Sequence, residues 1–187
     1  MEGKGRTLRS NAVLELVQVG LMAAIVFVAT SIIPIKTFMG VMHVGDSMVF
    51  IAAILLGKKK AVWASAIGMA LFDLSHGYLL WAPFTFVIKG AMAYIAAVIA
   101  YRADFKGEKF TNNLIAFVVS GIFMIAAYYI GGAIILTFLQ AEKQSFLQAV
   151  IISAKDIPTN IAQVVIGILI AVPLLGALRK AGVKNMI

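Results

Sequence analysis

Residues 44–73 read "VGDSMVFIAAILLGKKKAVWASAIGMALFD", two apolar runs on either side of three consecutive lysines. If this stretch were one membrane-spanning helix, Lys58–Lys60 would lie at mid-bilayer, where each lysine costs about 2.5–3.5 kcal/mol. A hairpin of two short helices, over roughly 44–57 and 61–73, places those lysines at the cytoplasmic surface instead. The lysines therefore favour a hairpin over a single span.

The two helices of this hairpin are too short to cross a membrane. About 14 residues rise about 20 Å, whereas the hydrocarbon core of a bilayer is about 30 Å thick. Their outer ends, at Asp46 and Asp73, must stop below the outer surface. Irregular backbone at that depth is tolerated only where protein buries it or where it lines a wet cavity. The sequence thus predicts a cup that opens to the outside.

The rest of the chain is similarly apolar. Of its 187 residues, 62% are hydrophobic and 13% are charged, and the mean hydropathy is +1.00. Long apolar runs without strand-like alternation predict an all-α integral membrane protein. We expect a single membrane domain over residues 1–187, with cytoplasmic tails at 1–11 and 179–187 around a bundle at 12–178. No cysteine is present, which excludes disulfides and thiol chemistry.

Six transmembrane helices with both termini cytoplasmic account for the order of apolar runs and basic clusters. Besides the hairpin, the expected helices cover 13–35, 80–101, 113–139 and 158–178, with an amphipathic or re-entrant piece at 145–156. Four clusters hold 12 of the 16 lysines and arginines, at residues 4–9, 58–60, 102–109 and 179–184. They fall in alternate connections, so the net charge of +8 indicates membrane topology rather than nucleic-acid binding.

The outer half of the expected bundle gathers ionisable residues, namely His43, Asp46, Asp73, His76, Lys89, Lys155 and Asp156. Ionisable side chains at membrane depth mark functional sites or paired structural ions. Lys89 follows Pro83 by six residues, about 9 Å below the helix start, which is too deep to reach the surface easily. It needs either a ligand or a neighbouring carboxylate, for which the candidates are Asp46, Asp73 and Asp156.

The last helix carries an amide pair near its start. Asn160 and Gln163 are three residues apart and share a helix face. Their amides can bond the edge of a heterocycle or, equally, a neighbouring helix. Asp156 precedes Pro158, and we expect it to cap this helix because Asp favours caps and Pro favours the first turn.

Aromatic side chains surround the loop between the third and fourth helices. Singly, such residues mark the bilayer interface, but beside buried polar groups they can form stacking walls for a flat ring. Together these features predict a substrate site made of His43, Asp46, Asp73, His76, Tyr78, Trp81, Phe84, Lys89, Tyr128, Lys155, Asn160 and Gln163.

The catalytic alternatives lack the necessary patterns. The segments "HVGD" and "DLSH" have no spacing diagnostic of a metal site, and no phosphate-binding loop of the Walker type is present. Ser75 and His76 are adjacent in the chain, an arrangement that rarely lets a nucleophile and its base face each other. We therefore expect no enzyme activity, no metal and no cofactor.

The stretches "HVGDSMVFIAAILLG", "AIGMALFDLSHGYLLWAPFTFVIKG" and "KDIPTNIAQ" together resemble the substrate-binding S component of energy-coupling-factor (ECF) vitamin transporters. The similarity covers about residues 12–178 and is closest to the branch for riboflavin, hydroxymethylpyrimidine and pyridoxine. It implies capture of a water-soluble vitamin from outside, docking on a transmembrane coupling subunit with two cytosolic ATPases, and toppling in the membrane to release the cargo.

In that family a small-residue face on the first helix meets the coupling subunit. Gly20 and Ala24 match the spacing, with Ala23 beside them, although these small residues could equally serve packing within the chain. The near-neutral charge of the site favours a compact hydroxylated ring: pyridoxine or hydroxymethylpyrimidine first, then riboflavin. A stand-alone secondary transporter and a structural membrane subunit without a ligand are the alternatives.

Overall fold

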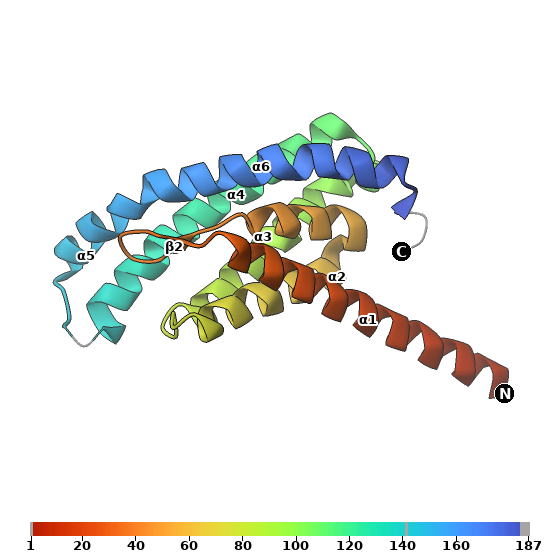
Figure 1. Ribbon diagram of the computed structural model, residues 1–187, viewed down its shortest axis with the longest axis horizontal. Helices are drawn as coiled ribbons and strands as arrows, with labels where there is room; N and C mark the ends of the chain where they lie inside the picture. The colour runs from red at the N-terminus through yellow and green to blue at the C-terminus, as the bar shows by residue number, and fades with distance from the viewer. Residues whose placement is uncertain (1, 141, 184–187) are drawn as a thin grey trace.

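The computed structural model describes residues 2–140 and 142–183, which are almost entirely helical (Figure 1). In chain order the elements are α1 (Glu2–Ile32), β1 (Ile35–Lys36), β2 (Val41–Met42), α2 (Asp46–Ser75), α3 (Ala82–Ala100), η1 (Arg102–Asp104), α4 (Phe110–Ile134), η2 (Ile135–Leu139), α5 (Phe146–Ser153), η3 (Ala154–Asp156) and α6 (Ile157–Lys180). Parts of the two expected tails, Met1 and residues 184–187, lie outside the described residues. The predicted all-α class is confirmed.

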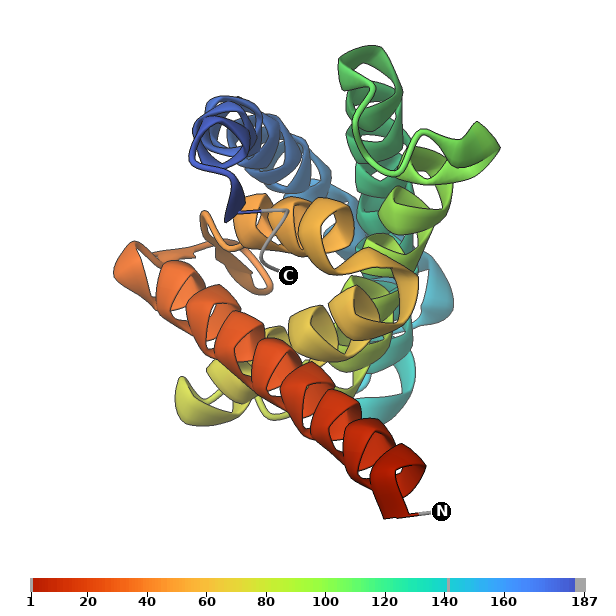
Figure 2. The same cartoon turned by 90° about the vertical axis from the view of Figure 1, so that its right-hand side faces the viewer.

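Helix α2 bends sharply at Gly57, immediately before the three lysines. Gly57 has φ 71° and ψ −171°, a backbone conformation that glycine adopts without the steric cost of a Cβ. The chain changes direction there, between an arm over 46–56 and an arm over 58–75 (Figures 1 and 2). The Tyr101 hydroxyl donates to the carbonyl of Ile54 over 2.7 Å, so a backbone acceptor near the end of the first arm keeps a partner. The break expected beside the lysines is therefore present, one residue before them.

Four helical stretches of the described chain are long and apolar enough to span a membrane: Ala12–Ile32, Ala82–Ala100, Phe110–Leu139 and Phe146–Lys180. Their outward faces carry large exposed apolar side chains, as lipid-facing helices do; Leu16 is 71% exposed and Leu169 is 67% exposed. Neither arm of α2 is among the four. The count of six spans and the cytoplasmic termini stay predictions.

The core of the bundle is built around the first arm of α2. Residues 49–54 are completely or almost completely buried, and they meet buried alanines of α3, including Ala93, Ala96 and Ala97. Helix α1 crosses the second arm at Gly68, where an added Cβ would overlap the Val26 side chain and the carbonyl of Ala23. Small residues at both crossings let the backbones approach closely.

Two segments near the pocket take forms that the sequence did not specify. Helix α1 ends at Ile32 rather than residue 35, and Ile35 and Lys36 instead pair in antiparallel register with Met42 and Val41. The piece expected at 145–156 is the short helix α5, which begins with a capping box between Ser145 and Gln148. Both segments lie at the end of the bundle opposite the α2 bend (Figure 1).

Candidate functional site

A pocket lies at the end of the bundle where the β1–β2 loop meets both ends of α2 and the starts of α3 and α6. Its walls are Thr37, Met39, Gly40, Val41, His43, Asp73, Tyr78, Trp81, Thr85, Tyr128, Gly132, Ser153, Asp156, Asn160 and Gln163. The space between these side chains, counted out to the open side, is about 560 Å³. The pocket is narrow and stays open on one side.

The β1–β2 loop covers this pocket and is held by Asp156. The Asp156 carboxylate accepts hydrogen bonds from the backbone N–H groups of Phe38, over 3.0 Å, and Met39, over 2.9 Å. The Thr37 hydroxyl donates to the same carboxylate over 3.3 Å. Asp156 is the N-cap residue of α6, as predicted, but its side chain makes no hydrogen bond to the start of that helix. The reason is that the backbone amides of the loop take the carboxylate.

Aromatic rings form one side of the pocket. Trp81 donates from Nε1 to the carbonyl of Met39 over 2.9 Å, which ties the loop to the start of α3 as well. The Trp81 ring lies 5.6 Å from the Tyr128 ring, measured between centroids. The Tyr128 hydroxyl donates to Thr85 over 3.1 Å. This wall is apolar across its faces and polar at its edges, as flat ligands require.

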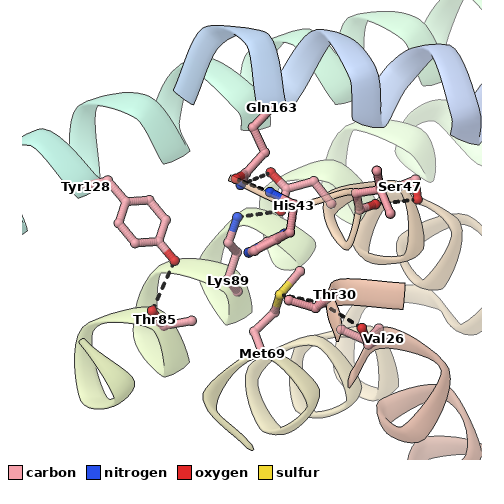
Figure 3. A network of polar contacts seen from close by, with 11 residues as sticks. Val26, Thr30, His43, Ser47, Met69, Thr85, Lys89, Tyr128 and Gln163 are labelled. Atoms are coloured by element: carbon pink, nitrogen blue, oxygen red, sulfur yellow. Dashed lines mark hydrogen bonds and ion pairs between the residues drawn. The ribbon is translucent and has the colours of Figure 1, made fainter. Parts of the chain in front are cut away.

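A buried ion pair adjoins the pocket wall through Gln163, and Figure 3 shows the polar network around it. The ammonium group of Lys89 bonds the carboxylate of Asp46, and both side chains are completely buried. Gln163 donates from Nε2 to the second carboxylate oxygen over 3.0 Å and accepts from the backbone N–H of His43 over 3.2 Å. Lys89 thus has its carboxylate, and neither member of the pair lines the pocket. The amide of Gln163 connects the pair to the pocket wall.

Three polar atoms of the pocket wall are buried without a hydrogen-bond partner: His43 Nδ1, Asp73 Oδ2 and Ser153 Oγ. Burial lowers the pKa of the His43 imidazole to about 4, so this side chain is neutral at neutral pH. Unpaired buried polar atoms are uncommon in folded proteins, and a group of them around one cavity needs an explanation.

The predicted site residues separate into three groups. Those that line the pocket are His43, Asp73, Tyr78, Trp81, Tyr128, Asn160 and Gln163. Asp46 and Lys89 adjoin it as the ion pair. The remaining three do not line it: His76 is exposed and stacks on Phe72, Phe84 packs toward Gly131 of α4, and Lys155 is exposed with its ammonium over the Phe38 ring.

Of the three small residues predicted to meet a coupling subunit, two are exposed and one is buried. Gly20 and Ala24 are exposed on α1, and nothing lies within 4 Å of a Cβ built at Gly20. Ala23 is buried against the second arm of α2 at Gly68. The exposed face is therefore narrower than the sequence suggested.

Sequence reasoning missed part of the pocket wall: Thr37, Met39, Gly40, Val41, Thr85, Gly132 and Ser153. Most are small or weakly polar residues in apolar surroundings, which carry no signal of their own. The β1–β2 loop offered one indirect signal, since a loop next to a predicted cup is placed to cover it. Gly132 permits close approach, because an added Cβ would lie 2.9 Å from Ser153 Oγ.

Two comparisons relate the sequence of this chain to known proteins. The family model described as "ECF-type riboflavin transporter, S component" matches residues 10–180. A protein of Pyrococcus woesei, described as "Uncharacterized protein in gap 3'region", is 35% identical over 97 residues, which are 51% of this chain. The chain spans 62% of the length of that relative. Because the family match covers nearly all of the helical bundle, the chain belongs to the family of ECF-type riboflavin transporter S components.

Proposed function

We propose that this protein is the substrate-capture subunit of an ECF-type importer and that its narrow pocket binds a small, flat, water-soluble vitamin. The observation that carries the proposal is the pocket itself, which joins the Trp81–Tyr128 wall, three unpaired polar atoms and a covering loop. Apolar walls with a few converging polar groups are typical of small-molecule sites.

The cargo we infer is a hydroxylated heteroaromatic ring. Pyridoxine and hydroxymethylpyrimidine are the compact candidates, and the amides of Asn160 and Gln163 offer both donors and acceptors to such a ring. Riboflavin is the larger candidate, and the description of the matching family supports it. Since the pocket is narrow and the β1–β2 loop lies over it, we expect the loop to lift from Asp156 and Trp81 when the vitamin enters.

The proposed transport cycle follows from the family. With six spans and both termini in the cytoplasm, the pocket faces outward and α1 presents Gly20 and Ala24 to a coupling subunit. That subunit and two cytosolic ATPases would drive toppling and inward release. A stand-alone secondary transporter would need no such partners, and a structural subunit would bind no vitamin.

Tryptophan fluorescence tests the capture step. The chain has two tryptophans: Trp81 lines the pocket, whereas Trp63 is 54% exposed on the outside of the bundle. The purified protein in detergent is titrated with pyridoxine, hydroxymethylpyrimidine, thiamine and riboflavin, alongside Trp81→Phe and the matched control Trp63→Phe. We expect saturable quenching with one vitamin that disappears in Trp81→Phe and persists in Trp63→Phe. A folded protein that binds none of the four would contradict the proposal.

Reconstitution separates the proposed importer from the secondary transporter. Proteoliposomes containing the chain alone should accumulate no vitamin, whereas those that also contain a coupling subunit and its ATPases should take it up when ATP is enclosed. Uptake by the chain alone, without ATP, would favour the secondary transporter.

A further inference from the structure

Asp73 differs from the other acidic residues at this end of the bundle because one of its oxygens has no partner. Lys89 and Gln163 satisfy the carboxylate of Asp46, and the loop amides satisfy that of Asp156. The Asp73 carboxylate has neither arrangement, and its Oδ2 is buried and unpaired. Asp73 is 5% exposed and lines the pocket, so a molecule bound there can reach this oxygen.

Half of the unpaired buried atoms of the described residues lie in the wall of this pocket. Among the described residues, six buried side-chain nitrogen and oxygen atoms lack a partner, and three of them belong to the pocket wall. The other two in the wall, on His43 and Ser153, can each donate or accept. Asp73 Oδ2 can only accept while the carboxylate is ionised. A ligand that completes this set must bring a hydrogen-bond donor to Asp73.

The charge of the wall adds a second restriction. Within the described part of the chain, no lysine or arginine lines the pocket, whereas Asp73 and Asp156 both do. The nearest buried cation, Lys89, is occupied by Asp46. A phosphate ester carries a charge of about −1.5 to −2 near neutral pH and would enter a wall that offers it carboxylates and no cation. Burying such an anion without a partner is strongly unfavourable.

We propose that Asp73 selects the cargo by accepting a hydrogen bond from an N–H or O–H group of the vitamin, so that the pocket takes free, neutral or cationic vitamins and rejects their phosphate esters. This inference rests on the proposed function, because it concerns the same pocket. It adds that the imported compound must lack phosphate, and that a kinase reaction inside the cell must follow if the cell requires the phosphorylated form.

Paired ligands test the inference without any mutation. The wild-type protein is titrated by calorimetry with pyridoxine and pyridoxine 5′-phosphate, and with riboflavin and flavin mononucleotide. Whichever free vitamin binds, we expect its ester to bind at least about 100-fold more weakly, because an uncompensated buried charge is added. An ester that binds as tightly as its free vitamin would overturn the charge argument even though the proposed function would stand.

The variant Asp73→Asn then tests the residue. It keeps the shape of the side chain but removes the charge, and we expect affinity for the free vitamin to fall by about 10- to 100-fold, as for a lost bond to a charged group. The ratio between the dissociation constants of the ester and the free vitamin should also become smaller. Asp104→Asn is the matched control, because Asp104 is exposed in the turn after α3 and does not line the pocket. Unchanged affinity and unchanged ester preference in a folded Asp73→Asn would overturn the inference.

Two outcomes separate this inference from the proposed function. If the wild-type protein binds no vitamin, the proposed function fails and the inference fails with it. If the wild-type protein binds a vitamin but Asp73→Asn behaves as Asp104→Asn does, only the inference fails. Should Asp73→Asn not fold, Asp73→Ser removes the same carboxylate with a smaller side chain, and vitamin affinity and ester preference equal to those of Asp104→Asn would overturn the inference.

Discussion

At the end of the bundle where α2 bends, polar side chains bond the protein's own backbone, whereas at the pocket several of them face a cavity. Tyr101 donates to Ile54, Asn112 to the carbonyl of Ile99 over 2.6 Å, and Asn113 to that of Gly107 over 2.7 Å. Near the bend, Asn113 Oδ1 and Arg179 Nε are also unpaired, but each of these side chains donates to a backbone carbonyl through another atom. At the pocket, the unpaired atoms of His43, Asp73 and Ser153 belong to side chains that line a cavity. The comparison teaches that buried polar residues in an apolar bundle can hold the chain or face a ligand site, and that their position beside a cavity distinguishes the two.

The loop after α3, residues 101–109, has a more strained backbone than the β1–β2 loop. Ala103, Asp104 and Lys106 all have positive φ, between 47° and 57°, a conformation that costs a non-glycine residue about 1–2 kcal/mol. Arg179 bonds the carbonyls of Gly107 and Glu108 from the end of α6. The β1–β2 loop, by contrast, is held across its span by Asp156 and Trp81. The first loop is held by Arg179 of α6, whereas the second is held by contacts that we expect cargo entry to break.

The largest expected effect comes from the ion pair that adjoins the pocket wall. Lys89→Met leaves the carboxylate of Asp46 buried without its cation, and the cost of such a change is about 3–5 kcal/mol of unfolding free energy. We expect a large fall in Tm in detergent. The double variant Asp46→Leu with Lys89→Met should recover much of it, and Lys36→Met, at an exposed lysine, should change little. A near-wild-type Tm for Lys89→Met alone would show that the pair is not structural.

The next effect concerns His43 at the pocket wall. Its pKa is about 4 in the folded protein against an ordinary value of 6.5, so the unfolded chain binds a proton first as the pH falls. The contribution of neutral His43 to stability is complete above pH 6.5 and shrinks toward pH 4, by about 2 kcal/mol at pH 5. Thermal melts of wild type and His43→Gln across this range check it. Parallel pH profiles for the two proteins would argue against burial of the imidazole.

Much of the fold could be predicted because its signals are local. The lysines after Gly57 required a break in α2, and the long apolar runs required helices, whatever the rest of the chain does. The role of Asp156 could not be predicted, because it bonds residues 117 to 119 positions away. The β1–β2 pairing is local, but strands of two residues are too short to leave a pattern in the sequence. A carboxylate before a proline predicts a helix cap, and the sequence contains no sign that a distant loop binds that carboxylate instead.

The same reasoning explains the outcome at the site. Charged and aromatic residues were identified because they are costly or conspicuous in an apolar chain, and Asp73, Trp81 and Gln163 do line the pocket. Ser153 gave no signal, since a hydroxyl in a helix usually bonds its own backbone. The sequence also left the partner of Lys89 open among three carboxylates, and only the packing of α3 on the start of α2 selects Asp46.

A smaller effect is expected where Asp156 holds the loop. Asp156→Asn keeps one acceptor but loses the charge that strengthens both bonds to the loop amides. We expect the vitamin to dissociate about 10-fold faster, since about 1.4 kcal/mol corresponds to a tenfold change. Stopped-flow fluorescence from Trp81 measures the rate, with Glu142→Gln as a control at an exposed acidic residue of a nearby loop. An unchanged dissociation rate would mean that Asp156 does not hold the loop over the cargo.

The smallest effect belongs to the bend. Tyr101→Phe removes the hydroxyl that bonds Ile54 and should lower the free energy of unfolding by about 1 kcal/mol. Vitamin affinity should not change, because the bend and the pocket lie at opposite ends of the bundle. Chemical or thermal unfolding measures the first quantity and the fluorescence titration measures the second. A fall in affinity without a fall in stability would reverse the roles assigned to the two ends.

Hydrogen–deuterium exchange read by mass spectrometry tests the contrast between the two ends most directly. The protein is compared with and without a saturating concentration of the vitamin that it binds, on peptides covering the β1–β2 loop and the turn after α3. We predict that the vitamin slows exchange at the amides of Phe38 and Met39, which the closed loop holds on Asp156, and leaves residues 101–109 unchanged. Equal protection at both ends, or protection at the bend alone, would contradict the account.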